Sequence, residues 1–459
     1  MLRRPSRMAI AFRPVDFLQP FSLLRYRTLL TRGQWWSTER MRAYQAKRLR
    51  IVLAHAQATV PYYREAFAKA GLLVDDIASP DDLARLPTLT KDVIRARADD
   101  LISTGASGRR VSRQTSTGTT GPPVTIALDS QTNALEFAFY WRHWGWFGYR
   151  LGDPFAQLSW SEFGHTRSGD IVRVQRGTGR LLLDALSISA NGVATFAAAM
   201  RRQRTRFLKG HPAALLHFAL FVRAARLELP PLRAVFTTGE VLEPGTRAVI
   251  GEVFAAPVAD AYGSMERVVS ACECPAGRMH INGDYGAWEL VDVQTDIVTG
   301  QRVGRVVGTS LHNLSMPLVR YEMGDLVEVD ESTGPCPCGR PLPTIGRIRG
   351  RSVDGIVTPD GRVVTVAAIV FNEVPSVALG QLVQEELGRL RVRVLPTSTF
   401  DHVEESRLLA RVRQLMGPEM VLDLERVDTP DAFGAPGAKH RTVISTVAQQ
   451  SVEAGQPLP

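Results

Sequence analysis

The stretch Thr115-Ser-Thr-Gly-Thr-Thr-Gly-Pro-Pro-Val124 consists of hydroxyl and glycine residues, with no large side chain before its two prolines. Glycines let a backbone approach an anion and direct successive N–H groups at it, while the hydroxyls add neutral donors around the same oxygens. The lysine of a GxxxxGK[ST] loop is absent, which excludes an ordinary Walker site. Taken alone, the segment is either a phosphate-binding loop or a flexible hydroxyl-rich turn.

The segments around this loop alternate between helical and strand patterns, as in a layered α/β domain. A helical layer is predicted over 37–70, with Pro61 opening its second helix, and further helix starts are expected at 79–83 and 90–93. Beyond these lie predicted strands at 124–128, 154–160, 234–237 and 258–261, and predicted helices at 135–146 and 194–206.

The end of the chain has a different pattern. Residues 286–328 are β-rich, and after Arg351 a smaller unit is predicted, with strands at 389–395 and 421–427 and a helix at 404–415. We therefore expect an α/β fold with three parts: a basic arm at 1–36, a large multi-layer domain at 37–350, and a small mobile α+β domain at 351–459.

Charge is unevenly distributed along the chain. The net charge is +9, but residues 1–50 alone carry +10, so the remainder sums to about −1. A near-neutral body has no basic face for a duplex, which argues against a nucleic-acid-binding protein. No run of 18 apolar residues and no secretory signal is evident, so we expect a cytoplasmic protein without a transmembrane segment.

The basic N-terminal arm allows two interpretations. Its apolar residues, from Phe17 to Tyr26, are interleaved with Arg25 and Arg27, a pattern that suits weak contact with an anionic membrane surface or a partner. Packing of the arm on its own protein body is the alternative, and it is the interpretation that we favour.

Several motifs follow the hydroxyl/glycine loop in a fixed order. They are Thr237-Thr-Gly-Glu240, Asp260-Ala-Tyr-Gly-Ser-Met-Glu266, Arg320-Tyr-Glu-Met-Gly-Asp325, Gly350-Arg-Ser-Val-Asp354 and Gly437-Ala-Lys-His-Arg441. In this order they resemble the adenylate-forming superfamily of acyl-CoA synthetases, adenylation domains and luciferases. The chain is most similar to the phenylacetate–CoA ligase and CapK-like branch, which Val60-Pro-Tyr-Tyr-Arg64 and Leu86-Pro-Thr-Leu-Thr-Lys91 also resemble. The resemblance covers nearly the whole chain and implies a large adenylate-forming domain with a small C-terminal domain.

The resemblance implies ATP/AMP, Mg²⁺ and, as acceptor, CoA as ligands. The loop residues Ser116, Thr117, Gly118, Thr119, Thr120 and Gly121 would hold the β- and γ-phosphates. Tyr262 would stack on adenine, in a nucleotide pocket that also includes Gly239, Glu240, Asp260, Ala261, Gly263 and Ser264. Asp325 would accept hydrogen bonds from the ribose hydroxyls.

The resemblance also names three catalytic residues. Glu266 would hold Mg²⁺, for which a carboxylate is a suitable hard ligand. Arg351 would reach the ribose and phosphate region. Lys439, on a C-terminal loop, would stabilise the negative charge that develops at the α-phosphate.

Two departures from the family pattern concern the phosphate loop and the hinge. Pro122-Pro123-Val124 supplies no lysine, so phosphate binding would rest on backbone and hydroxyl groups. Val353 stands where many members have an acid or lysine as the hinge between domains, and this bears on the second half-reaction.

The four cysteines form two Cys-x-Cys pairs, Cys272/Cys274 and Cys336/Cys338, and His280 follows the first pair. Reduced cysteines are expected in a cytoplasmic protein, so a tetrahedral structural zinc site is favoured over disulfides. By resemblance to the zinc-binding insertion of CapK-like members, the ligands are Cys274, His280, Cys336 and Cys338. An all-cysteine site that includes Cys272 remains the alternative, and buried reduced cysteines without metal are another.

The sequence therefore predicts an enzyme that adenylates a carboxylic acid and then transfers the acyl group to CoA or a carrier thiol. An AMP-forming ligase or adenylyltransferase with an amine or hydroxyl acceptor, similar to CapK or coenzyme F390 synthetase, is the alternative. An aromatic-rich segment between Phe137 and Trp146 either walls the acyl pocket or packs in the core, and the second is favoured. Nothing in the sequence identifies the acid.

Overall fold

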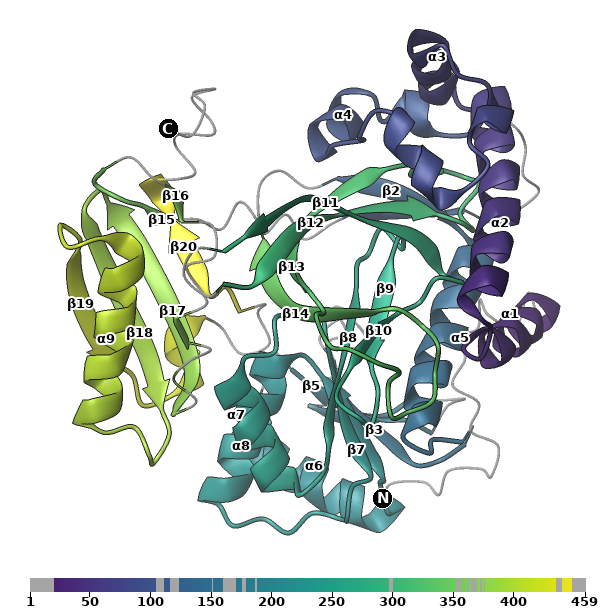
Figure 1. Ribbon diagram of the computed structural model, residues 1–459. Helices are drawn as coiled ribbons and strands as arrows, with labels where there is room; N and C mark the ends of the chain where they lie inside the picture. Colours follow the sequence, from purple (N-terminus) through teal and green to yellow (C-terminus); the bar gives the residue numbers. More distant parts are fainter. Residues whose placement is uncertain are drawn as a thin grey trace. The chain divides into compact units, whose positions relative to one another are not determined.

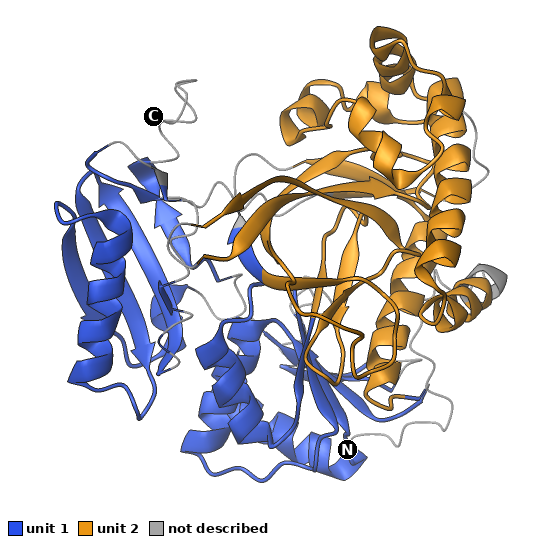
Figure 2. Ribbon diagram, in the orientation of Figure 1, with its two compact units in different colours: residues 1–11, 150–260, 348–459 blue, residues 12–149, 261–347 orange. Residues whose placement is uncertain are grey.

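The chain forms two compact units, shown in Figure 2: unit 1 comprises residues 1–11, 150–260 and 348–459, and unit 2 comprises residues 12–149 and 261–347. The computed structural model describes the following residues: 20–104, 111–115, 124–150, 152–159, 171–175, 179–185, 188–296, 300–351, 356–360, 363–364, 370–371, 374, 376–434 and 440–447. The units are interleaved in sequence, because the chain leaves unit 2 after residue 149 and returns to it at 261.

Unit 2 begins with the helical layer that the sequence predicts. Its helices are α1 (Pro20–Gly33), α2 (Thr38–Thr59), α3 (Pro61–Ala70), α4 (Lys91–Ala96) and α5 (Ser130–Trp146) (Figure 1). Ser37 caps α2 by accepting from the backbone of Arg40 at 3.2 Å, and Pro61 starts α3 at the position where proline is best tolerated. The helix start expected at 79–83 is a short 3₁₀ turn, Pro80–Arg85, with a capping box between Ser79 and Asp82.

The strands of unit 2 are mostly antiparallel. They are β1 (Val111–Thr115), β2 (Thr125–Asp129), β9 (Ser270–Glu273), β10 (Met279–Ile281), β11 (Gly286–Thr295), β12 (Arg302–Ser310), β13 (Tyr321–Val329) and β14 (Thr344–Arg351). β1 pairs with β2 alone, so the hydroxyl/glycine loop connects two adjacent antiparallel strands. The others follow the order β11-β12-β13-β14-β10-β9, next to the end of β8 (Val258–Gly263).

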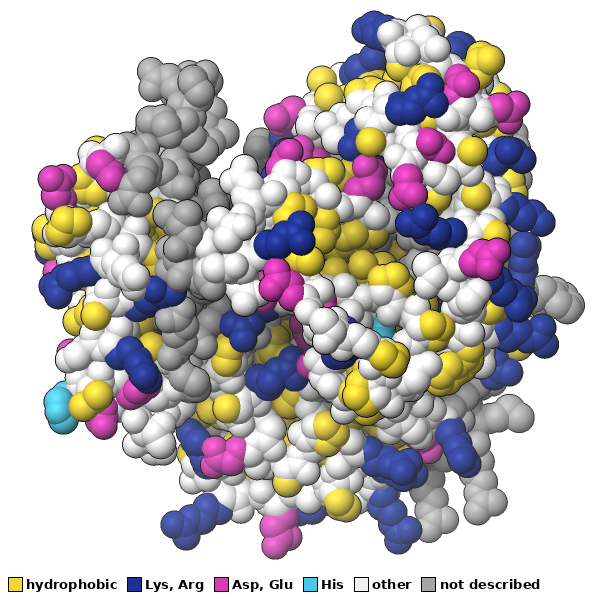
Figure 3. Space-filling view, viewed as in Figure 1, with side chains coloured by type: hydrophobic (Ala, Val, Ile, Leu, Met, Phe, Trp, Pro, Cys, Tyr) yellow, Lys and Arg dark blue, Asp and Glu magenta, His cyan; other side chains and the backbone are white. Residues whose placement is uncertain are grey.

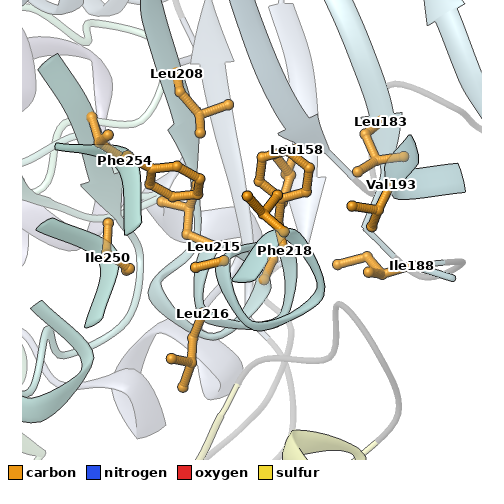
Figure 4. Close-up of a cluster of buried hydrophobic side chains, with 14 of the residues drawn as sticks. Leu158, Leu183, Ile188, Val193, Leu208, Leu215, Leu216, Phe218, Ile250 and Phe254 are labelled. Atoms are coloured by element: carbon orange, nitrogen blue, oxygen red, sulfur yellow. The ribbon is translucent and has the colours of Figure 1, made fainter. Parts of the chain in front are cut away.

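Unit 1 contains a mainly parallel sheet of β4 (Val172–Val174), β5 (Leu181–Asp184), β3 (Phe155–Ser159), β6 (Phe207–Gly210), β7 (Ala234–Thr238) and the start of β8, in that order. β6 and β7 are consecutive parallel strands joined by α7 (Pro212–Ala224), and two further helices, α6 (Ala190–Gln203) and α8 (Pro244–Phe254), complete the layer. Phe218 of α7, Leu158 of β3 and Phe254 of α8 lie in one buried apolar cluster (Figure 4).

The last part of unit 1 is a small α+β assembly. β17 (Val377–Glu386), β18 (Arg389–Pro396), β19 (Val421–Arg426) and β20 (Val443–Ser445) form a sheet in the order β19-β18-β17-β20, and α9 (His402–Met416) connects β18 to its parallel neighbour β19. A small hairpin, β15 (Ile356–Val357) and β16 (Val363–Val364), precedes it. These elements match the strands and helix predicted after residue 351, and the mixed α/β fold is confirmed. The boundaries of the three predicted parts stay a prediction.

No helix among the described residues has the length and apolarity needed to span a bilayer. Residues 20–33 of the predicted basic arm form α1, whose Tyr26 and Leu30 are buried in unit 2. Packing of this part of the arm on its own body is therefore observed.

Gly286, the first residue of β11, lies against the backbone that follows Glu266. A Cβ atom placed on Gly286 would lie 1.8 Å from the carbonyl oxygen of Val268. No side chain fits at that distance without displacement of the backbone, so glycine is required here.

We expect Gly286→Ala to destabilise the protein by more than about 2 kcal/mol, since the clash involves rigid backbone and not the end of a flexible side chain. Gly145→Ala in α5 is the matched control, because no atom lies within 4 Å of the position that its Cβ would take, and it should raise stability or leave it unchanged. Chemical unfolding of the two variants beside the wild type measures the difference. Equal stability of the two variants would contradict this account of the close approach.

Candidate functional site

Tyr262 and Asp325 are in direct contact in unit 2, although they are far apart in sequence. The Tyr262 hydroxyl donates to Asp325 Oδ2 at 2.6 Å, and the Trp288 ring meets the Tyr262 ring edge-on with centroids 5.5 Å apart. The expected adenine-stacking ring and the expected ribose-binding carboxylate are thus joined by one hydrogen bond to a charged acceptor, which is among the stronger kinds.

A β-bulge positions Asp325. In the pairing of β12 with β13, Leu326 lies opposite Arg305 and Glu322 opposite Val307, so an irregularity falls between them on β13. Gly324 within this bulge has φ +76°, a conformation that glycine adopts without steric cost. Bulges redirect side chains, and this one turns Asp325 out of the regular ladder.

Glu266 lies on a tight turn and is mostly buried, with 8% of its surface exposed. The turn is closed by the backbone N–H of Arg267, which donates to Ser264 O at 3.1 Å. The Tyr321 hydroxyl donates to Glu266 Oε1 at 2.9 Å, leaving the other carboxylate oxygen available for a cation. No cluster of three or more candidate ligand groups surrounds Glu266 among the described residues.

A partly buried ion pair that the sequence analysis missed holds this turn. Arg267 has φ +55°, in the left-handed region, and its Nη1 lies 2.7 Å from Glu136 Oε1 of α5. Tyr285 donates to the second Glu136 oxygen at 2.6 Å. Burial by itself lowers the pKa of Arg267, but the Glu136 carboxylate raises it above its ordinary value, so the guanidinium stays charged. In the sequence, the only indication of this ion pair is that Arg267 directly follows Glu266 of the motif.

In unit 1, the predicted nucleotide residues occupy the ends of neighbouring strands. Thr237 donates to Asp260 Oδ1 at 2.6 Å, and both side chains are buried. Gly239 has φ +84°, and a Cβ there would lie 2.7 Å from the His211 ring. Glycine is therefore required at position 239 for two reasons: the left-handed backbone conformation and the lack of space for a Cβ beside His211.

The Glu240 side chain, only 4% exposed, accepts hydrogen bonds from two backbone N–H groups. One belongs to Ala213, in the first turn of α7, at 3.0 Å to Oε2, where a carboxylate also complements the helix dipole. The other belongs to His440 at 3.4 Å to Oε1, and His440 Nε2 lies 3.0 Å from Gly380 O. Burial lowers the pKa of His440 to about 4, so its ring is neutral near pH 7.

The four predicted zinc ligands come together in unit 2. The ligand atoms of Cys274, His280, Cys336 and Cys338 all lie within 4.8 Å of one another, and the first three side chains are buried. Leu342 O lies 3.0 Å from His280 Nδ1 and can only accept, so Nδ1 carries the proton and Nε2 faces Cys338 Sγ at 3.3 Å. Burial lowers the pKa of His280, and a neutral imidazole oriented in this way fits a metal ion.

Two similar turns present the sulfur atoms. Cys274-Pro-Ala-Gly277 and Cys336-Pro-Cys-Gly339 each place proline second and glycine fourth, the glycines have φ near +77°, and each glycine N–H donates to the first cysteine's carbonyl. These two Cys-Pro-x-Gly strings are the ones in which the sequence resembles the zinc-binding insertion of CapK-like members. Cys272, on β9, is not in the group of four.

Several predicted site residues lie outside the described residues. Ser116, Thr117, Gly118, Thr119, Thr120, Gly121 and Lys439 are not among the described residues, and only the backbone of Arg351, at the end of β14, is described. Ala261, Gly263 and Ser264 lie at the end of β8 and in the turn that follows it. Of the aromatic residues of α5, Phe139, Trp141 and Trp144 are buried, as core packing predicts, whereas Phe137, Tyr140 and Trp146 are half-buried.

The sequence of the chain is similar to several curated proteins, whereas no protein-family model matches it. It is 27% identical over 345 residues to a phenylacetate–coenzyme A ligase of Pseudomonas putida, covering 72% of this chain and 75% of the relative. It is 22% identical to the CapK protein of Staphylococcus aureus, covering 74% and 75% of the two chains.

Solved structures of adenylate-forming ligases share the fold. A 2-hydroxyisobutyryl-CoA ligase in its postadenylation state, in complex with 2-HIB-AMP, matches with a TM-score of 0.69 at 20% identity, over 93% of this chain and 94% of that one. The same enzyme in complex with R3-HIB-AMP gives 0.66 at 19% identity, over 92% and 94%. By sequence the chain is similar to phenylacetate–coenzyme A ligase and to CapK, and it has the fold of adenylate-forming acyl-CoA ligases.

Proposed function

We propose that the protein activates a carboxylic acid with ATP, releasing pyrophosphate, and passes the acyl group from the acyl-adenylate to CoA or a carrier thiol. The contact between Tyr262 and Asp325 carries the proposal, because it joins an aromatic face for adenine to a carboxylate for the ribose hydroxyls. The relatives support it: the curated ones include phenylacetate–coenzyme A ligases, and a related structure carries both 2-HIB-AMP and CoA.

The proposed chemistry begins when a substrate carboxylate oxygen attacks the α-phosphorus of ATP. The bond to the bridging oxygen breaks and pyrophosphate leaves. Negative charge spreads over the phosphate oxygens, and Lys439 stabilises it as a fixed cation. Glu266 would hold Mg²⁺, for which a carboxylate is a suitable hard ligand, while its Oε1 accepts a hydrogen bond from Tyr321.

The acceptor then completes the reaction. A thiolate attacks the acyl carbonyl carbon, the bond to the AMP oxygen breaks, and AMP leaves with the electron pair. An amine or hydroxyl acceptor, which the sequence resemblance to the CapK-like branch leaves open, is the competing outcome. The two acceptors give chemically distinct products, so one assay separates them.

We further propose that Cys274, His280, Cys336 and Cys338 hold a structural zinc ion. Four protein ligands close the coordination sphere, so the ion would not act on substrate. Its function would be to fix the β9–β10 turn to the loop after β13. The binding free energy of a structural zinc ion, on the order of 10 kcal/mol, stabilises the folded state.

The first prediction concerns adenylation itself. Across a panel of carboxylic acids, at least one should elicit acid-dependent ATP–pyrophosphate exchange, and Lys439→Ala should lower the exchange rate by about 10²–10³, as loss of a single charge-stabilising donor does. Lys47→Ala, at an exposed position of α2, is the matched control and should retain full activity.

Absence of exchange with every acid, together with equal ATP consumption by wild type and Lys439→Ala, would refute the adenylation proposal. With a positive acid in hand, addition of CoA should yield a thioester detectable by mass spectrometry. An amide or ester formed in place of the thioester would assign the CapK-like alternative.

The second prediction tests the contact between Tyr262 and Asp325. Tyr262→Phe keeps the ring but removes the hydroxyl that orients the carboxylate, so the KM for ATP should rise about five- to tenfold, which corresponds to about 1 kcal/mol, the net contribution of a typical hydrogen bond. kcat should change little. Steady-state kinetics with varied ATP provides the measurement, and Asp325→Asn combined with Tyr262→Phe should be less than additive. Additive effects would mean that the two residues act separately.

The third prediction tests the metal. Freshly purified protein should contain about one zinc per chain by elemental analysis, and Cys338→Ser should lose it. Cys272→Ala is the control and should keep the metal, because Cys272 is outside the group of four. Loss of zinc in Cys272→Ala, with retention in Cys338→Ser, would reassign the ligands, and metal-free wild type would refute the site.

A further inference from the structure

Helix α1 packs on unit 2 along one side only. Tyr26 and Leu30 are buried; the Tyr26 ring meets His312 edge-on at 5.4 Å, and Leu30 O accepts from Arg142 of α5 at 3.2 Å. These contacts, one helical turn apart, fix the orientation of the helix. The opposite side of α1 is therefore held outward in a defined way.

The outward side of α1 has an apolar centre with arginines on both flanks. At 100° per residue, Leu24, Thr28 and Thr31 lie opposite Tyr26, with Arg27 on one flank and Arg25 and Arg32 on the other. All six side chains are exposed. We call these six residues, together with Trp35, the α1 face. In the view of Figure 3, Lys and Arg side chains gather along the edge formed by α1 and α2.

The two threonines of the α1 face contribute methyl groups to its surface, because their hydroxyl hydrogens are already bonded within the helix. Thr28 Oγ1 donates to Leu24 O at 3.0 Å and Thr31 Oγ1 donates to Arg27 O at 2.7 Å. Such bonds to the preceding turn use the hydroxyl hydrogen internally. Leu24, 54% exposed, adds a large apolar group to the same stripe.

Trp35 lies two residues beyond the end of α1 and is held in place although 53% of it is exposed. The Arg340 guanidinium lies 5.0 Å from the centre of its ring, and Arg340 also donates to Gln34 at 3.1 Å. Arg340 stands directly after Gly339 in the second Cys-Pro-x-Gly turn. The contact with Arg340 thus holds the large, exposed Trp35 ring in place at the surface.

Charge completes the pattern. Helix α1 contains three arginines and no acidic residue, and none of the three forms an ion pair with an acid among the described residues. In sequence, residues 1–19 add four arginines against Asp16 alone. A positive, partly apolar face with a tryptophan at one end has the composition of helices that lie in the headgroup region of anionic bilayers.

We propose that the α1 face docks on the surface of an anionic lipid bilayer, with Leu24 and Trp35 inserted among the headgroups and the arginines paired with lipid phosphates. Nucleic acid fits this face less well. Side-chain hydroxyl groups commonly donate to the phosphate backbone, but the hydroxyls of Thr28 and Thr31 already donate within the helix. A duplex backbone also offers no apolar surface for the exposed Leu24. This proposal does not rest on the adenylation proposal.

The test is co-sedimentation of the full chain with vesicles of phosphatidylcholine alone or with 30% phosphatidylglycerol. The wild type should bind the anionic vesicles, bind neutral ones weakly, and dissociate as salt rises. Each arginine near a membrane surface contributes roughly a fivefold gain in affinity. The triple variant Arg25→Gln, Arg27→Gln, Arg32→Gln should therefore bind about 100-fold more weakly.

A matched triple variant, Arg202→Gln, Arg223→Gln, Arg413→Gln, removes the same charge from exposed positions of α6, α7 and α9 and should bind as the wild type does. Leu24→Ser with Trp35→Ser should weaken vesicle binding by about tenfold or more while keeping its salt dependence. ATP–pyrophosphate exchange should be unchanged in all of these variants.

Two results would overturn the proposal. One is equal loss of binding in the two arginine variants, which would mean that net charge and not the α1 face is responsible. The other is failure of the wild type to bind anionic vesicles at low salt, including the case in which it binds a duplex oligonucleotide through the same arginines, which would assign the face to nucleic acid.

Discussion

The interaction on which unit 2 depends is the buried ion pair between Arg142 and Asp284, with side chains 2% and 0% exposed. The guanidinium forms two bonds to the carboxylate, at 2.6 and 3.1 Å, and also donates to Leu30 O and to Asn282. Burial of two charges is costly, and loss of one partner typically costs about 3–5 kcal/mol. The pair is tolerated because it joins three segments at once: α1, α5 and the turn between β10 and β11.

Helix α5 extends this linkage from the ion pair to the functional groups of unit 2. One end supplies Glu136, which holds Arg267 and with it the turn of Glu266. The other end supplies His143, whose Nε2 lies 3.0 Å from Glu273 O beside the first metal-binding turn, and Trp146, which meets His280 edge-on. The α1 face, the candidate magnesium ligand and the candidate zinc site thus share one helix, so their geometry is set by the packing of that helix.

The sequence was sufficient for the order of elements and for the grouping of the cysteines with His280, since both depend on local patterns. Helix α2, the short strands of unit 1 and the Cys/His group all lie where motif and periodicity placed them. Side-chain and strand contacts between residues far apart in sequence could not be predicted from local patterns. The Arg267–Glu136 pair spans more than a hundred residues and carries no periodic signal, and the bulge that redirects Asp325 depends on its register with β12.

Glu240 shows how a motif can leave the function of a residue open. The resemblance placed Glu240 in the wall of the nucleotide pocket, yet its carboxylate accepts from the backbone of Ala213 and of His440. His440 is the first described residue after Phe433-Gly434 and directly follows Lys439 in sequence, so Glu240 contacts the chain next to the expected catalytic lysine. At 3.4 Å this bond is long and correspondingly weak, whereas the bond to the first turn of α7 is short. The bond to Ala213 is therefore the one that fixes the Glu240 carboxylate, and the bond to His440 can break at little cost without releasing it.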